Sequence, residues 1–524
     1  MRNILVCSLL FISQLSWSQT KSKLTGWYIA PVGVKVTIQK DSLTDLLLDA
    51  KPNGSDNITR TPFAFAESFV NGLPYTLKLK SVPPGITAII YKGIRGTTGV
   101  SPDFIRVGAD YTYELQSRST DNKTFGTFYD SQSPAIGGDF AEEGRYVAFL
   151  SSAANLDGST GKKRQIFYRD RKTGATTLIS KSQSGEEANG DCMAPVIAGD
   201  GKSVAFESYA TNLANDDNNS VRDVYVWTAA KGVQRVSALA GAGANGESYE
   251  PAISGNGNLI AFSSGASNLT EGVNGNSTIN VFIRDMNAGT VKLVSADRLT
   301  GAGVGGSAAS ISDDGTRLAF CSMSASLTEN DNNGLWDIFV YDHANPVLKR
   351  ISVAPGGTER VQGNESASRV VYPAISGNGA YVAYATTAGN LVPGDNNNAQ
   401  DVFLCEIATG QTARVSVDAA GKEGNGDSPA GQGERVAISM DGSMLAFTTA
   451  ATNLGTSAGN ILLYDLVNKK IRPVTKDGYA GRPVISRNGG YVFFGIGARL
   501  DGRYSSSGLF TYYTGLTPCF SCNN

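Results

Sequence analysis

The sequence has a single histidine, His343, in a DHANP segment with the composition of a turn. A Ser-His-Asp triad needs a histidine base, and many zinc and iron sites use several histidines. This scarcity argues against both kinds of chemistry. The GTSAG segment at Gly455–Gly459 has the spacing of a serine-hydrolase nucleophile, but it lacks the base and is predicted to lie in a loop between strands.

The chain also has no excess of positive charge, since 45 Lys and Arg stand against 47 Asp and Glu. Proteins that bind nucleic acid need a basic field, so we expect no nucleic-acid partner. Tryptophan is scarce as well: beyond residue 18 it is limited to Trp27, Trp227 and Trp336. A broad aromatic platform for stacking sugars is therefore not evident.

Long apolar runs are confined to the N-terminus. Arg2 precedes an apolar stretch from Ile4 to about Leu15, and small residues follow at Ser16 and Ser18, which is the pattern of a signal peptide over residues 1–18. A membrane anchor would need about 20 apolar residues. The sequence thus predicts a periplasmic or secreted protein, with no transmembrane segment after cleavage, and we expect a monomer.

The cysteines do not form an even set. Loss of Cys7 with the signal peptide leaves an odd number of the six cysteines, so a disulfide framework does not hold the fold together. Cys321 and Cys405 lie in strand-like runs, where buried thiols are expected. The C-terminal tail, residues 517–524, contains Cys519 and Cys522 at C-x-x-C spacing, for which a local or intermolecular disulfide is favoured over redox catalysis.

Glycine is plentiful, with 61 residues, as suits short strands joined by tight turns. One phrase occurs seven times, at spacings of roughly 47 to 64 residues. Each copy predicts a hairpin with Asn-Gly or Asp-Gly in its turn, residues that accept positive φ. The copies are SPAIGGDFAEEGRYVAFLS from Ser133, APVIAGDGKSVAFES from Ala194, EPAISGNGNLIAFSS from Glu250, SAASISDDGTRLAFCS from Ser307, YPAISGNGAYVAYAT from Tyr372, ERVAISMDGSMLAFTT from Glu434 and RPVISRNGGYVFFGI from Arg482.

Most copies continue with two further strand-like runs, such as DIFVYD at Asp337 and LKRIS at Leu348. Four antiparallel strands repeated seven times predict an all-β fold with a seven-bladed β-propeller. The alternatives are a long sandwich and a solenoid, although solenoid repeats are shorter, about 20 to 30 residues.

The repeats resemble the TolB-like, WD-like propeller repeats of exported bacterial proteins, over about Ser133 to Thr514. The resemblance implies the fold, and it implies a role only loosely, because such propellers serve as interaction scaffolds and as accessory domains of peptidases. The first copy departs from the pattern through an insertion in its turn, and the last has no evident fourth strand.

A segment before the first repeat is expected to supply that strand. We assign residues 111–516 to the propeller and predict that YTYELQSRS, Tyr111–Ser119, pairs beside Gly508–Thr514 and closes the last blade. Residues 19–110 alternate apolar and polar positions in VKVTIQ and YTLKLK, which predicts half-buried strands. This segment is similar to a small bacterial immunoglobulin-like β-sandwich but lacks the cysteine pair common in that family; a spacer or docking role is expected.

Three loops between second and third strands share the pattern D-N-N-x-x-x-D. Oxygen ligands at positions one, three and seven could converge on Ca²⁺. Against this, Asp and Asn are favoured at strand corners without any metal, and the NGNSTIN loop at Asn274 loses both acids. Both interpretations stay open for the candidate metal ligands, which are Asp217, Asn219, Asp223, Asp331, Asn333, Asp337, Asp395, Asn397 and Asp401.

For function, the sequence favours a non-catalytic exported scaffold whose propeller contacts an envelope protein or a glycan. The alternative is a polysaccharide-acting enzyme that uses carboxylates in the propeller funnel. Acids converging with a Tyr or an Arg at the central channel would favour the enzyme, and an apolar or amide-lined channel would favour the scaffold. No catalytic or cofactor-binding residue is assigned.

Overall fold

The computed structural model divides the chain into two units, residues 1–112 and 113–524. In the first unit it describes the strands. In the second it describes residues 114–115, 135–137, 144–154, 156–215, 217, 219–239, 242–270, 278–361, 372–430, 435–456, 458–475, 480–496 and 508–513. The predicted signal peptide and the C-terminal cysteines lie outside the described residues. Within the described part no helix is long and apolar enough to cross a membrane.

The first unit contains two four-stranded sheets, of order β5-β2-β10-β8 and β4-β3-β7-β9. The predicted strands VKVTIQ and YTLKLK are present as β3 and β7, while an immunoglobulin-like sandwich stays a prediction. The strands are β1 (Lys21–Ser22), β2 (Thr25–Pro31), β3 (Lys35–Lys40), β4 (Thr44–Asp49), β5 (Ile58–Ala64), β6 (Phe69–Val70), β7 (Pro74–Ser81), β8 (Ile86–Lys92), β9 (Arg95–Thr97) and β10 (Ile105–Tyr111).

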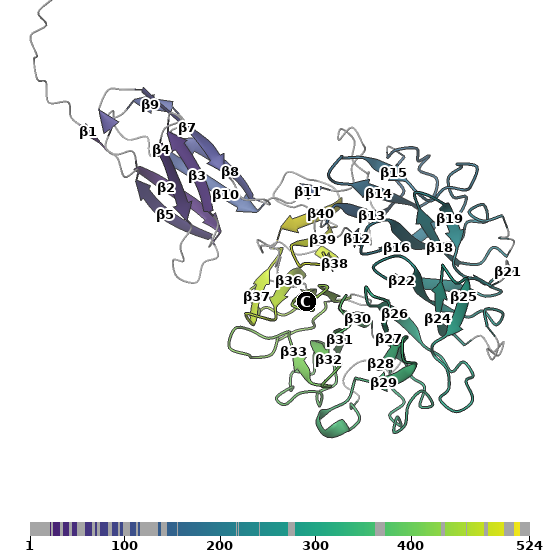
Figure 1. The fold of residues 1–524 in the computed structure, drawn as a ribbon. Helices are drawn as coiled ribbons and strands as arrows, with labels where there is room; N and C mark the ends of the chain where they lie inside the picture. Colours follow the sequence, from purple (N-terminus) through teal and green to yellow (C-terminus); the bar gives the residue numbers. More distant parts are fainter. Residues whose placement is uncertain are drawn as a thin grey trace, which may run out of the picture. The chain divides into compact units, whose positions relative to one another are not determined.

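The second unit is a β-propeller. Six of its sheets are each built from four successive antiparallel strands, and we call them blades 1 to 6 (Figure 1). Their strands are β12 (Ala135–Gly137), β13 (Tyr146–Ser151), β14 (Gln165–Asp170) and β15 (Thr176–Leu178); β16 (Cys192–Ile197), β17 (Ser203–Ser208), β18 (Asp223–Thr228) and β19 (Gly232–Arg235); β22 (Ser248–Ile253), β23 (Leu259–Ser264), β24 (Asn280–Asp285) and β25 (Thr290–Leu293); β26 (Ser307–Ile311), β27 (Arg317–Ser322), β28 (Asp337–Asp342) and β29 (Val347–Arg350); β30 (Ala374–Ile375), β31 (Tyr381–Thr386), β32 (Asp401–Glu406) and β33 (Thr412–Arg414); β34 (Ala437–Ile438), β35 (Met444–Thr449), β36 (Asn460–Asp465) and β37 (Lys470–Pro473). A short ribbon, β20 (Ala238–Leu239) with β21 (Ala242–Gly243), and a 3₁₀ turn, Pro355–Gly357, lie between blades.

The seventh repeat differs from the expected blade. It supplies three strands, β38 (Ala480–Ile485), β39 (Tyr491–Ile496) and β40 (Gly508–Tyr513), and the fourth is β11 (Glu114–Leu115). Glu114 pairs with Thr511 and Leu115 with Phe510, so the predicted pairing of this segment with the last repeat is confirmed. The sequence predicted seven blades, the last of them closed by the segment before the first repeat. Six blades of four successive strands are formed, and the seventh sheet is mixed because no strand after β40 is described. We call the mixed sheet the closing sheet.

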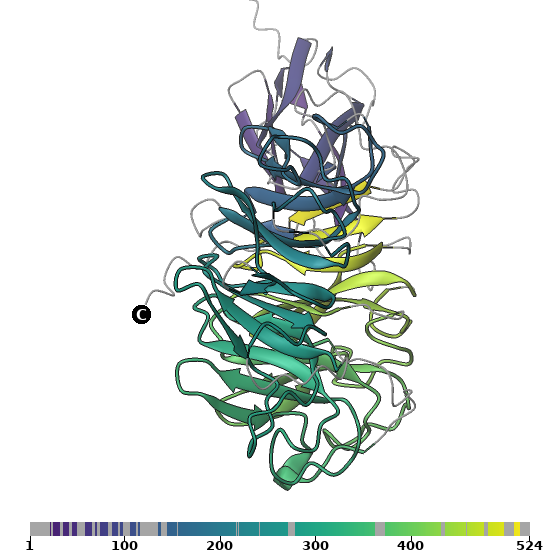
Figure 2. The ribbon, with the colours of Figure 1, turned by 90° about the vertical axis from the view of Figure 1, so that its right-hand side faces the viewer.

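The sheets surround a common axis with their first strands innermost, and they appear edge-on in the turned view (Figures 1 and 2). First strands contact their successors from β12 through β38, and β38 in turn contacts β12. Apolar clusters fill the space between successive sheets; one of them joins Val147 and Phe149 of blade 1 to Phe493 of the closing sheet. Each sheet therefore buries both faces against its neighbours, which suits the continuous apolar runs of the second strands.

Aromatic pairs repeat inside the blades at the register of second and third strands. Phe149 and Phe167 stack with ring centroids 5.6 Å apart, and the equivalent pairs in blades 2 to 5 lie at 5.7 to 6.0 Å. The A-F dipeptide of the repeat is thus a core element. Cys192, Cys321 and Cys405 are buried free thiols, as the strand-like setting of the last two predicted.

The repeated hairpin turns confirm the role of glycine and correct that of Asn and Asp. Gly257 has a φ of 75°, and its amide bonds to the Ser254 carbonyl. Asn256 does not adopt positive φ; its side chain instead accepts the Asn258 amide at 3.0 Å. The acid or amide is therefore selected to satisfy the backbone through its side chain.

Asparagine side chains join successive blades on the face opposite these turns. Asn245, after blade 2, accepts the Ser267 amide at 2.8 Å, and Asn268 of blade 3 accepts the Asn245 amide at 2.9 Å. The same exchange links Asn189 with Thr211 and Asn212. The A-[TS]-N-L segments that follow second strands thus lock each blade to the preceding loop.

Candidate functional site

The structure places the D-N-N-x-x-x-D acids of blade 2 against an arginine from the fourth strand. Arg235 Nη1 lies 3.7 Å from an Asp217 carboxylate oxygen and 3.4 Å from one of Asp223. All three side chains are at most 3% exposed. Asp223 also accepts the Ser237 hydroxyl at 2.5 Å, and Tyr225 donates to Asp217 at 2.5 Å.

Blades 4 and 5 repeat this arrangement and add a third acid. Arg350 Nη1 lies 2.7 Å from Asp331, 3.6 Å from Asp337 and 3.5 Å from Glu359. Blade 4 also has Arg360, whose Nε lies 3.3 Å from Asp337.

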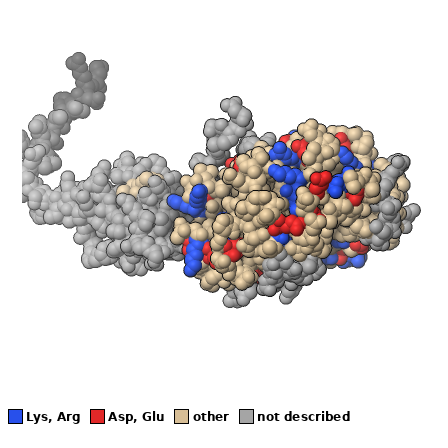
Figure 3. Space-filling model, turned by 90° about the horizontal axis from the view of Figure 1, so that it is seen from below, with Lys and Arg blue, Asp and Glu red and all other residues tan. Residues whose placement is uncertain are grey.

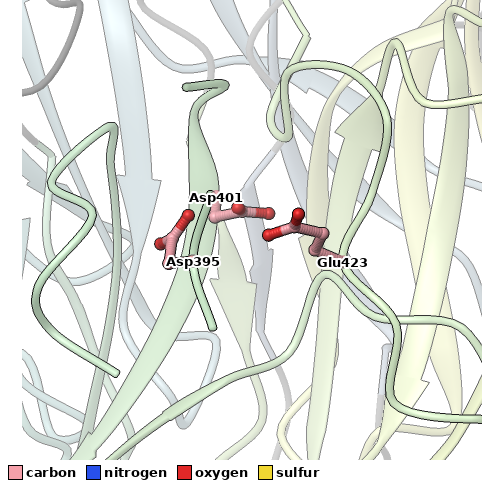
Figure 4. Close-up of side chains that lie close together, drawn as sticks. All are labelled: Asp395, Asp401 and Glu423. Carbon is pink, nitrogen blue, oxygen red and sulfur yellow. The ribbon is translucent and has the colours of Figure 1, made fainter. Parts of the chain in front are cut away.

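In blade 5, Arg414 Nη1 lies 3.2 Å from Asp395, 3.5 Å from Asp401 and 2.9 Å from Glu423. Carboxylate oxygens of these three acids all lie within 4.8 Å of one another, as Figure 4 shows.

The predicted asparagine ligands serve the loop backbone. Asn333 accepts the Leu335 amide at 2.9 Å and donates to Asp337 at 2.8 Å. Asn397 does the same toward Ala399 and Asp401, while Asn219 donates to the Ala244 carbonyl at 2.6 Å. The structure thus brings the predicted residues of each loop together, around an arginine that the sequence analysis did not include.

The arginine occurs only where the third strand begins with Asp. In blades 1, 3 and 6 that position holds an amide, and Asn280, for example, accepts the Ser295 hydroxyl at 3.0 Å. The fourth-strand position then holds Leu178, Leu293 or Pro473 in place of arginine. This pairing of Asp with Arg within one chain was visible in the sequence, and it shows that the guanidinium compensates the buried carboxylates.

Burial raises the pKa of at least one aspartate in each loop. It raises the pKa of Asp223, Asp331 and Asp395 to about 6. For Asp331 and Asp395 the neighbouring Asp carboxylate raises the pKa further, and the arginine opposes both effects. The acids could ligate a hard cation only if it displaced this guanidinium or shared the carboxylate oxygens with it. Their assignment to Ca²⁺ therefore stays a prediction.

A second group of polar residues spans the axis at the hairpin-turn end of the first strands. Arg487, after β38, donates from Nε to Asp313, after β26, at 3.0 Å, and its Nη2 lies 3.6 Å from the Met440 sulfur. Other repeats hold Gly199, Gly255 or Gly377 at the same turn position. We call Asp313, Met440 and Arg487 the axial latch.

Charged and aromatic residues from blades 2, 3, 5 and 6 meet at the opposite end of the first strands. Arg435 Nη2 lies 3.8 Å from Glu250 Oε1, and its guanidinium carbon lies 4.4 Å from the centre of the Tyr372 ring. Arg222 covers the Tyr249 ring at 4.3 Å. We call Glu207, Arg222, Tyr249, Glu250, Tyr372 and Arg435 the axial cluster.

The carboxylates of the axial cluster accept hydrogen bonds from the backbone and side chains of the blades. Glu250 Oε2 accepts the Ala308 amide at 3.0 Å and the Ser263 hydroxyl at 3.3 Å. Glu207 accepts the Glu250 amide at 3.4 Å and lies 3.5 Å from Arg222. Each acid thus ties one blade to the next.

Burial raises the pKa of Glu207, although Arg222 opposes the shift. Burial, followed by the charge of Glu250, raises the pKa of Tyr249 to about 12 and also raises that of Tyr372.

The acids, tyrosines and arginine that would favour an enzyme therefore do converge on the axis, but both acids are engaged in holding the blades together. The sequence analysis named no residue of this cluster. A signal was available, because the residue before the P-x-I core is Ala194 or Ala308 in some repeats and Glu250, Tyr372, Arg435 or Arg482 in others.

No protein-family model matches the sequence, and a comparison with curated proteins finds no significant match. Among solved structures the chain is similar to TolB from Acinetobacter baumannii, with 16% identity, 60% of this chain and 61% of that chain covered, and a TM-score of 0.35. It is similar to an oligogalacturonate lyase from Vibrio parahaemolyticus (10% identity, 77% and 96% covered, TM-score 0.47) and to the β-propeller domain of the Trilobed protease from Pyrococcus furiosus (13%, 74% and 96%, 0.44). The predicted resemblance to TolB-like propellers is confirmed at the level of the fold, and the comparison gives no function.

Proposed function

We propose that this chain is an exported, non-catalytic binding scaffold whose propeller holds an envelope protein or a glycan over the axial cluster. One observation carries the proposal. Features that build the blades recur around the ring, as the aromatic pairs and hairpin turns do, whereas the axial cluster places large charged and aromatic side chains where equivalent positions hold Ala194 and Ala308. Because alanine serves at this position in other repeats, the larger side chains found here are candidates for recognition.

The proposal also includes the location of the protein and the role of its first unit. The signal peptide supports an envelope or extracellular location, the first unit serves as an immunoglobulin-like sandwich for spacing or docking, and the closing sheet acts as the seventh blade. On the face drawn in Figure 3, Lys and Arg side chains lie among Asp and Glu side chains. Such a surface suits recognition by individual charge pairs better than attraction by a field of one sign.

The test is crosslinking in intact cells. A photoreactive residue at Tyr209, which is 40% exposed and whose ring lies 5.8 Å from the Arg222 guanidinium, should give a discrete adduct. The same residue at Val467, on a hairpin tip of the opposite face and 78% exposed, is the matched control. Equal adducts at both positions, or none at Tyr209, would remove the axial cluster as the binding surface.

The second candidate, a polysaccharide-acting enzyme, is supported by the pair Glu207 and Glu250. Glu207, whose pKa burial raises, can act as a general acid. The matching assay incubates the protein with a panel of polysaccharides and measures new reducing ends or unsaturated products. Product that disappears in Glu250→Gln would establish the enzyme; retention of a polysaccharide without product supports the scaffold.

A further inference from the structure

Within the described part of the propeller, Arg435 is a cation with no hydrogen-bond acceptor. Its side chain is 52% exposed, and its nearest carboxylate oxygen, on Glu250, lies at 3.8 Å, beyond hydrogen-bond length. No described residue accepts a hydrogen bond from it. By contrast, Arg235, Arg350 and Arg414 are at most 8% exposed and lie between two or three carboxylates.

The guanidinium is nevertheless held in place. It lies 4.4 Å from the centre of the Tyr372 ring, close enough for a cation–π contact, and Glu250 attracts it from across the axis. A guanidinium has all its N–H donors in one plane. Stacking on a ring covers a face of this plane and leaves two parallel N–H groups at its edge free to bind a carboxylate. The equivalent position in the next repeat also holds an arginine, Arg482, which is exposed.

The surroundings favour a sugar over a peptide as carrier of that carboxylate. Peptides are usually captured by an open sheet edge, an apolar groove or an aromatic groove for polyproline. The axial cluster instead offers tyrosine rings and the partly exposed Arg222, and beside it lies the carboxylate of Glu247, which is 46% exposed. These groups match the hydroxyls and ring faces of a saccharide.

We propose that Arg435, supported by Tyr372, binds the carboxylate of an acidic glycan of the uronic-acid class at the axial cluster. This inference rests on the proposed scaffold function and narrows it to one ligand class. Arg435 binds the carboxylate through paired N–H···O bonds, and Tyr372 is a positioning residue.

The test is titration calorimetry of the full mature chain with three probes. They are a uronic-acid oligosaccharide, the same oligosaccharide with its carboxyls methyl-esterified, and an oligoglutamate of equal charge. The acidic sugar should bind at least 10-fold more tightly than its ester. Arg435→Gln should weaken acidic-sugar binding by a similar factor and leave the ester unaffected, because both changes remove the same contact.

Two further variants separate recognition from folding. Arg435→Lys keeps the charge but cannot form the paired N–H···O bonds. Its affinity for the acidic sugar should therefore lie between those of Arg435→Gln and the original protein. Arg298→Gln removes another partly exposed arginine, which lies 3.5 Å from Glu329, and should leave the affinity unchanged.

Equal binding of acid and ester, or an affinity insensitive to Arg435, would overturn the inference. Oligoglutamate binding as tightly with the same dependence on Arg435 would also overturn it, in favour of an acidic peptide. If no sugar binds while the Tyr209 crosslink persists, the ligand class is wrong and the scaffold function stands. Loss of both removes the scaffold function as well.

Discussion

Two carboxylates that share one guanidinium keep a net negative charge after pairing. In blades 2 and 5 this charge is almost completely buried, whereas in blade 4 Arg360 supplies a second guanidinium to Asp337. Removing one partner of such a buried pair leaves an uncompensated charge. Amide blades avoid the problem with Asn280 or Asn460 and an apolar partner. The two solutions occupy the same place in the fold and should be interchangeable when exchanged as a set.

Arg235→Leu alone should destabilise the protein by about 3–5 kcal/mol. The triple variant Asp217→Asn, Asp223→Asn, Arg235→Leu should recover most of this loss, because an asparagine in place of Asp223 can accept the Ser237 hydroxyl as Asn280 accepts that of Ser295. Thermal unfolding of the original protein and the two variants measures the difference. A triple variant no more stable than the single one would show that the ion pairs themselves hold the loop.

Calcium should not stabilise the protein strongly. Arg414 already lies within 3.5 Å of Asp395, Asp401 and Glu423, so an ion must compete with it. A ligand that binds only the folded state contributes about 2.7 kcal/mol at 100 times its dissociation constant. Unfolding midpoints with Ca²⁺ and with chelator should therefore agree. A clear rise with Ca²⁺ that vanishes in Asp331→Ala or Asp395→Ala would instead make these loops metal sites.

Stability should fall as the pH rises from about 4 to about 6. The pKa of Asp331 is about 6 in the folded protein, against 3.8 for an ordinary Asp, so the folded state binds more protons over this range. Asp337, Arg350 and Glu359 face this carboxyl. Asp223 and Asp395 shift in the same direction.

Asp331→Asn should reduce the slope of the unfolding midpoint against pH in this window. The control is Asp297→Asn, since backbone amides lower the pKa of Asp297 to about 2, and its contribution is lost only as the pH falls below about 4. An unchanged slope in Asp331→Asn would contradict the assigned cause.

At the scale of elements, the repeat in the sequence predicted the strands and turns, but individual residues did not predict the axial cluster. The strands and turns followed from alternating runs and Asn-Gly or Asp-Gly pairs, because these depend on neighbours in sequence. The axial cluster depends on which residues meet across the ring. Glu250 and Arg435, for example, are 185 positions apart in the sequence. One sequence does not reveal such contacts, although its departures from the repeat mark where to look.

The glycine at the turn position before Asn or Asp has a steric role that the repeat pattern alone did not explain. A Cβ on Gly377 would collide with the Asp313 carboxylate and lie 2.7 Å from Met440 Cγ. Gly377→Ala should therefore destabilise the protein by about 1–3 kcal/mol. Adding Asp313→Gly, the residue found in several other repeats, should relieve the clash with the carboxylate and leave only the contact with the flexible Met440 side chain.

The double-mutant cycle of Gly377→Ala and Asp313→Gly, measured by thermal unfolding, tests this steric account. Because Asp313→Gly alone also removes one partner of Arg487, the test compares the double variant with the sum of the two single variants, and the difference is the coupling energy. Additive effects would show that the alanine is accommodated without displacing the axial latch.

At the scale of the whole molecule, the ring is joined by strands from its two ends. β11 and β40 pair although nearly 400 positions separate Glu114 from Thr511, and the apolar cluster between Phe149 and Phe493 packs the closing sheet against blade 1. Without β11, β40 would present an unpaired edge. Open edges lower stability and invite pairing with other chains.

Replacing both residues of β11, Glu114→Pro and Leu115→Pro, should open this junction, since proline cannot donate to the ladder. We expect a lower unfolding midpoint, faster amide exchange in β40 and concentration-dependent association. Glu114→Ala with Leu115→Ala is the matched control, because alanine keeps the backbone donors while truncating the same side chains. If the alanine pair is as damaging as the proline pair, side-chain packing and not strand pairing closes the ring. If neither has an effect, the contacts between β38 and β12 suffice to hold the propeller shut.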